Sequence, residues 1–69
     1  MNLERDLKLA QADSRIEEAE RNIRQVASLV PGLAARGIST SEIEGHIDLM
    51  SEALYHLKEQ RRLIHSTCH

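Results

Sequence analysis

The chain has 69 residues, of which 41% are hydrophobic and 29% are charged, and its formal net charge is −2. This length allows one small domain, and the composition is that of an ordinary soluble protein. Because the charge is evenly spread and no apolar run exceeds three residues, the sequence favours neither nucleic-acid binding nor a membrane span. Tyr55 is the single aromatic residue and Cys68 the single cysteine, which indicates an aliphatic core, no internal disulfide and a cytoplasmic location.

The first predicted element is a helix from about residue 3 to 30. Its apolar residues recur at alternating spacings of three and four, the heptad pattern of a helix that packs along another helix. Leu3, Leu7 and Ala10 point away from that pattern at about 100° per residue, so they are either a frayed end or a contact with another chain. The heptad positions are Leu9, Ala12, Ile16, Ala19, Ile23, Val26 and Val30.

A turn is predicted over residues 31–38, where the strongest helix-breaking residues lie. Pro31 donates no backbone hydrogen bond and its ring clashes with the carbonyl of Ala27. We therefore expect a kink at Pro31, one further helical turn, and Gly37 in the left-handed conformation that ends it. A complete break at Gly32 is the alternative.

A second helix is predicted from about residue 39 to 65, followed by a flexible tail over 66–69. Ser39 and Glu42 have the spacing of a capping box, and Ile38 and Ile43 have that of a hydrophobic staple. Only Arg61 interrupts the main heptad row, which is Ile43, Ile47, Met50, Leu54, Leu57 and Ile64. A second row runs beside it, consisting of His46, Leu49, Ala53, His56, Gln60 and Leu63.

These elements predict an all-α fold, an antiparallel αα-hairpin of two long helices forming a single domain over residues 1–69. Two apolar rows on one helix are more than a single partner helix can cover, so we expect two hairpins to form a homodimeric four-helix bundle. If His46 and His56 are buried at the dimer axis, mild acid should weaken the dimer. The residues expected to contact a second copy or another partner are Leu3, Leu7, Leu49, Ala53, His56 and Leu63.

The remaining polar clusters give weak signals for chemistry. His65, Cys68 and His69 are metal-ligating residue types, but paired zinc-binding spacings are absent, so we favour a tail without metal; an intermolecular Cys68 disulfide is a further alternative. The sequence contains neither a nucleophile–base pair nor a phosphate loop, and we predict no catalytic residue and no cofactor. The basic residues Lys58, Arg61 and Arg62 offer the alternative of a nucleic-acid-binding regulator whose basic patch is duplicated by dimerisation.

A set of core and turn positions carries a family resemblance over residues 7–64. These positions are Arg15, Ile16, Glu20, Ile23, Gln25, Leu29, Val30, Leu33, Gly37, Thr40, Met50, Leu54, Leu57 and Arg61–Ile64. In them the chain resembles a group of small uncharacterised bacterial helical-hairpin proteins, which implies the fold and no particular activity. Pro31 departs from the continuous first helix of that group.

The hairpin is also similar to the short sporulation phosphatase regulators, whose second helix carries a Ser-Gln-Glu-Leu-Asp signature. The corresponding stretch here is Ser51-Glu52-Ala53-Leu54-Tyr55, which lacks the acidic last residue, so that function is not expected. The sequence as a whole favours a small non-enzymatic homodimer that acts by protein–protein interaction, as an adaptor, a regulator or an inhibitor.

Overall fold

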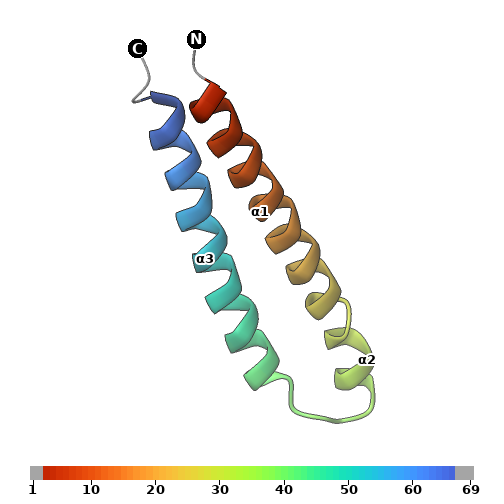
Figure 1. Ribbon diagram of the computed structural model, residues 1–69. Coiled ribbons are helices and arrows are strands. Elements are labelled where there is room, and N and C mark those ends of the chain that lie inside the picture. Colours follow the sequence, from red (N-terminus) through yellow and green to blue (C-terminus); the bar gives the residue numbers. More distant parts are fainter. Residues whose placement is uncertain (1–2, 67–69) are drawn as a thin grey trace.

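The computed structural model describes residues 3–66, which form three helices. They are α1 (Leu3–Ala27), α2 (Val30–Ala35) and α3 (Ser41–Ser66). The helices α1 and α3 run antiparallel beside each other, and α2 lies at the turn, so the start of α1 and the end of α3 meet at one end of the molecule (Figure 1). The predicted all-α hairpin of two long helices is confirmed for the single chain.

The contact between α1 and α3 runs along the two predicted heptad rows, which we call the seam. Every predicted seam residue is partly buried, as is Leu33, which continues the row into α2. Arg61, the one polar member of the row on α3, is also partly buried. The heptad pattern therefore identified the residues of the helix–helix contact correctly.

The first helix is interrupted earlier than the sequence predicted. The break lies at Ser28 and Leu29, because α1 ends at Ala27 and α2 begins at Val30. The amide of Leu29 bonds the carbonyl of Val26, three residues back, at 3.1 Å. Pro31 is still the cause, since it removes the next bond of the helix, but the chain adjusts on the N-terminal side of the ring.

The alternative of a break at Gly32 is wrong, because Gly32 lies within α2. Pro31 sits in the first turn of this short helix, where a backbone amide hydrogen has no partner within the helix. The end of α2 follows the prediction. Gly37 has a φ of 75°, and the amides of Gly37 and Ile38 donate to the carbonyls of Ala34 and Leu33, each at 3.0 Å. These are the two bonds of a Schellman motif.

The helix α3 begins slightly later than predicted. Its first residue is Ser41, and the carbonyl of Thr40 accepts the first helical bond from the amide of Glu44 at 2.9 Å. Thr40 is therefore the N-cap instead of Ser39, whose hydroxyl bonds the hydroxyl of Ser41 at 3.0 Å. Three consecutive hydroxyl residues offer similar caps, and this is why the sequence did not distinguish between them.

The hairpin is a narrow rod without a buried core. It measures 56 × 14 × 10 Å, and its radius of gyration is 16.3 Å, whereas a compact chain of this length would have about 11 Å. Its accessible surface is 5413 Å², about 1,000 Å² above the roughly 4,400 Å² typical of a folded monomer of this mass. Within residues 3–66 no side chain is fully buried. The single hairpin thus has a seam but no interior.

Candidate interaction surface

Two different edges flank the seam. On the first, which we call the ion-pair edge, Lys58 lies 3.7 Å from the carboxylate of Glu20, and Arg61 donates a hydrogen bond to Asp13. On the second, which we call the hollow edge, Arg15 and other α1 side chains line a hollow with residues of α3. At about 100° per residue Asp13 and Arg15 lie about 160° apart around α1, which places the two edges on opposite sides.

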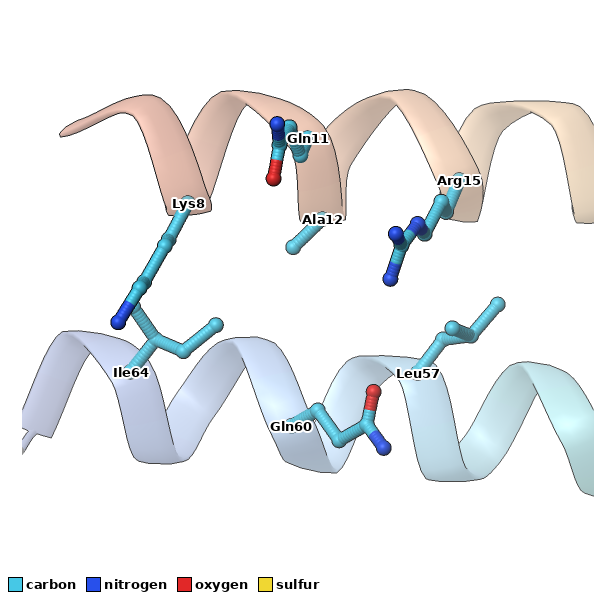
Figure 2. A pocket seen from close by; sticks show the side chains of 7 residues that line it. All are labelled: Lys8, Gln11, Ala12, Arg15, Leu57, Gln60 and Ile64. Atoms are coloured by element: carbon cyan, nitrogen blue, oxygen red, sulfur yellow. The ribbon is translucent and has the colours of Figure 1, made fainter. Parts of the chain in front are cut away.

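The hollow is a small basic cavity with an apolar floor, about 130 Å³ in volume. Figure 2 shows Lys8 and Arg15 extending from α1 towards α3 on either side of Ala12. Lys8 is 3.6 Å from the carboxylate of Glu4, while Arg15 makes no ion pair with any residue of 3–66. No carboxylate lines the hollow, whose residues are Lys8, Gln11, Ala12, Arg15, Leu57, Gln60 and Ile64.

The hollow is not among the sites predicted from the sequence. Its signal was the seven-residue spacing of Lys8 and Arg15, which places both cations on the same side of the seam. The cavity is well below the 300–1,000 Å³ of ordinary small-molecule sites, so it is suited to the head of one side chain.

The second apolar row of α3 lies along the hollow edge, because its member Gln60 also lines the hollow. We call this row the α3 stripe. All of its members are exposed in the single hairpin, including Leu49 at 66% and Leu63 at 50%. Its residues are His46, Leu49, Ala53, His56, Gln60 and Leu63. The stripe is therefore a face of α3, half of it apolar, that α1 does not cover.

The histidine at the middle of the stripe has partners only on its own helix. Its Nε2 lies 4.0 Å from the carboxylate of Glu52, one turn earlier. The rings of Tyr55 and His56 meet edge to face, with 5.6 Å between their centroids. Neither contact reaches α1, and His56 remains exposed.

Leu3 and Leu7 do not belong to the α3 stripe. Both are exposed, at 67% and 56%, on the first turns of α1. At about 100° per residue Leu3 is about 80° from Asp13, whereas Leu7 is about 80° from Arg15, so the two leucines lie on the outer face of α1, between the two edges. The six residues predicted for intermolecular contact thus form two surfaces, the α3 stripe and a separate Leu3–Leu7 patch.

The predicted basic cluster lies near the end of α3, where Lys58, Arg61 and Arg62 line a shallow depression. Lys58 and Arg61 bind the α1 carboxylates of the ion-pair edge, and Arg62 bonds Glu59 at 2.9 Å. The hydrogen bond from Arg62 and its positive charge hold the pKa of Glu59 below its usual value, and the same hydrogen bond and the negative charge of Glu59 raise the pKa of Arg62. Each cation thus has its own carboxylate, unlike the unpaired basic surfaces that bind phosphate groups.

Metal and membrane sites receive no support from residues 3–66. This part of the chain contains no cluster of metal-ligating side chains, and its helices are too short or too polar to cross a membrane. His65 lies in the last turn of α3, whereas Cys68 and His69, the other members of the predicted tail cluster, lie outside the described residues.

No family model, curated protein or solved structure shows significant similarity to this chain. Its function is therefore inferred from its own residues and geometry.

Proposed function

We propose that this chain is a non-enzymatic, cytoplasmic homodimer whose hairpins form a four-helix bundle, and that it acts by binding another protein as an adaptor, a regulator or an inhibitor. One observation carries the dimer: within residues 3–66 no side chain is fully buried, while the α3 stripe leaves Leu49 and Leu63 half or more exposed. The surplus of about 1,000 Å² over a compact monomer is close to the roughly 800 Å² that each partner buries in a standard interface.

The α3 stripe is the surface that we assign to the dimer. It is continuous over about five turns of one helix and lies beside the seam, so a second copy placed on it would extend the packing already present. Burial of a leucine side chain contributes about 1.5–3 kcal/mol, and association would bury Leu49 and Leu63 in both copies. This contribution offsets the lack of an interior in the single hairpin.

The Leu3–Leu7 patch is the surface that we assign to the protein partner. It lies on α1, apart from the α3 stripe, and both leucines are more than half exposed in the single hairpin. Two exposed leucines one turn apart, with the charged residues Arg5 and Asp6 between them in the chain, form an apolar patch that a partner protein can cover.

Sedimentation velocity over a range of protein concentrations tests the dimer. We expect a particle of twice the 7.8 kDa chain mass, which dissociates when Leu49 and Leu63 are both changed to Glu. Ser51→Glu is the control, since Ser51 is exposed on the other side of the same helix, and it should leave the dimer intact. A monomer of 7.8 kDa that unfolds cooperatively in dilute solution would refute the dimer.

Photo-crosslinking in host cells tests the partner surface. We expect a protein to be crosslinked by the wild-type chain and lost with Leu3→Ser/Leu7→Ser, a variant that should still sediment as a dimer. If this variant still crosslinks the same protein, the Leu3–Leu7 patch is not the surface that binds the partner.

Fluorescence anisotropy with labelled DNA and RNA tests the competing nucleic-acid function. We expect no binding at physiological salt, because the three cations of the basic cluster are paired. Binding that weakens steeply with salt and disappears in Arg62→Glu would replace the protein-binding proposal.

A further inference from the structure

The residues of the α3 stripe alternate between two kinds of position. Those nearer the seam are His46, Ala53 and Gln60, and those farther from it are Leu49, His56 and Leu63. When two such helices pack in parallel and in register, each residue meets its own counterpart, whereas antiparallel helices join a near position to a far one. An antiparallel pair would therefore set each leucine against a histidine, an alanine or a glutamine. A parallel pair sets Leu49 against Leu49 and Leu63 against Leu63.

The charges along the hollow edge point to the same arrangement. A two-fold axis parallel to α3 places the α1 helices of the two copies on opposite sides of the α3 pair. The side of α3 that faces away from its own α1 is then turned towards α1 of the other copy. Glu59 belongs to this side, since it is about 160° from the seam residue Leu57.

The positions of Arg15 and Glu59 along the length of the hairpin also agree with parallel packing. Arg15 lines the hollow together with Leu57 and Gln60, so it lies level with residues 57–60 of α3. In a parallel, in-register pair Glu59 of the second copy lies at that same level. Arg15 has no ion pair within residues 3–66, and the hollow beside it has room for a carboxylate but contains none.

Resting on the homodimer proposed above, we infer that the two α3 helices pack in parallel and in register, and that Glu59 of each copy binds at the Lys8–Arg15 hollow of the other. Ala53, the smallest residue of the stripe, lies at its centre and allows the two helices to approach closely. The Glu59 contact gives the dimer its specificity, because an antiparallel copy or an unrelated hairpin does not present a carboxylate at this position.

Disulfide trapping tests the register. In a Cys68→Ser background, Ala53→Cys should crosslink readily with its counterpart under mild oxidation. Ser51→Cys, an exposed position on the other side of α3, is the matched control and should crosslink much more slowly. Rapid crosslinking of a mixture of Ala53→Cys and His56→Cys chains, with little in Ala53→Cys alone, would show antiparallel packing and overturn the inference while leaving the homodimer intact. A monomer would overturn both proposals.

Charge reversal tests the Glu59 contact. Arg15→Glu and Glu59→Arg should each weaken dimerisation about fivefold, and the double variant should recover most of the wild-type affinity, because the pair is restored with its signs exchanged. Arg21→Glu, which reverses an exposed cation on the outer face of α1, should leave the dissociation constant unchanged. A double variant no tighter than the two single variants would overturn the assignment of Glu59 to the hollow.

Discussion

The helix α3 carries two rows of residues with the same heptad spacing, and the two rows differ in what covers them. The seam row packs against α1 and is partly buried along its length, whereas the α3 stripe beside it is exposed throughout. Composition accounts for the difference. The seam row has one polar residue, Arg61, while half of the stripe is polar, namely His46, His56 and Gln60. Heptad spacing thus shows that residues share a face of a helix, and composition indicates which face folding covers first.

The largest expected effect is a difference in stability loss between the two rows when one leucine in each is changed to alanine. Leu54→Ala in the seam should destabilise the hairpin by about 2–3 kcal/mol, towards the lower end of the range for buried leucines because Leu54 is only partly buried. Leu49→Ala in the stripe should change the stability of a single hairpin by less than about 0.5 kcal/mol.

Urea unfolding at a low and a high protein concentration measures this contrast. The loss of unfolding free energy in Leu54→Ala should be present at both concentrations. The loss in Leu49→Ala should be larger at the high concentration, where association stabilises the wild type. An equal loss of unfolding free energy in Leu49→Ala at both concentrations would contradict the assignment of the stripe to an interface.

A second effect concerns the polar residue of the seam. Arg61→Ala removes the hydrogen bond that joins α3 to Asp13 of α1, and because the pair is half exposed we expect a loss of about 1 kcal/mol. Arg62→Ala, whose partner Glu59 is on the same helix, should cost less in the same urea titration. If Arg62→Ala lost as much unfolding free energy as Arg61→Ala, or more, Arg61 would not be holding the two helices together.

The turn offers a test that disturbs the seam without touching the stripe. Gly37→Ala should destabilise the hairpin by about 1 kcal/mol, because residues with a side chain rarely adopt a φ of 75°. Gly32→Ala is the matched control: Gly32 lies within α2, and an added methyl group meets no atom within 4 Å, so thermal unfolding should show unchanged or higher stability. Similar losses in both variants would contradict the left-handed terminator as the cause.

Acid should distinguish the two rows, since the seam row contains no histidine and the stripe contains His46 and His56. In the single hairpin the Nε2 atom of His56 lies 4.0 Å from the carboxylate of Glu52, and in the parallel dimer that we propose His56 would face its counterpart. Lowering the pH from about 8 to 5.5 should therefore weaken association a few-fold while the helical content of the single hairpin is retained. Sedimentation and circular dichroism at both pH values check this, and an unchanged dissociation constant would place the histidines outside the interface.

The smallest effect lies at the Glu59–Arg62 pair. Arg62 lowers the pKa of Glu59 in the folded chain, so the pair stabilises the fold above the ordinary Glu range, and this contribution is lost as the pH falls below 4.5. At a low protein concentration, where the proposed Glu59 contact between copies does not contribute, wild type should therefore melt slightly above Glu59→Gln at about pH 6, and the difference should vanish in acid once Glu59 is protonated in the folded chain as well. A difference that persists in acid would mean that the charge of Glu59 is not its source.

Local patterns were sufficient to predict the helices and the seam. Leu9, Ile16 and Ile23 repeat at a period that only an α-helix places on one face, and Gly37 ends a helix by its own backbone preference. The exact boundaries required the structure. Ser28 and Leu29 carry no breaking signal of their own, because the interruption is caused by Pro31 further along the chain.

The candidate surfaces were predictable as single residues but not as groups. The exposed leucines stand out in the sequence as candidates for intermolecular contact, but the sequence did not indicate which of them would serve a second copy and which another partner. Lys58 and Arg61 resemble a basic patch until the fold brings Glu20 and Asp13 of α1 against them. In each case the missing information was the rotational position and alignment of one helix against the other.

The sequence by itself determined that this chain forms two amphipathic helices joined at a proline–glycine turn, because helix period, proline and glycine act through bonds within a few residues. Only the tertiary structure decided which charges are paired, that Arg15 lines a hollow without a carboxylate, and that no residue of 3–66 is fully buried. The ion pairs between α1 and α3 and the lining of the hollow join residues that are far apart in the chain, and their meeting is set by how α1 and α3 align, which no local pattern specifies.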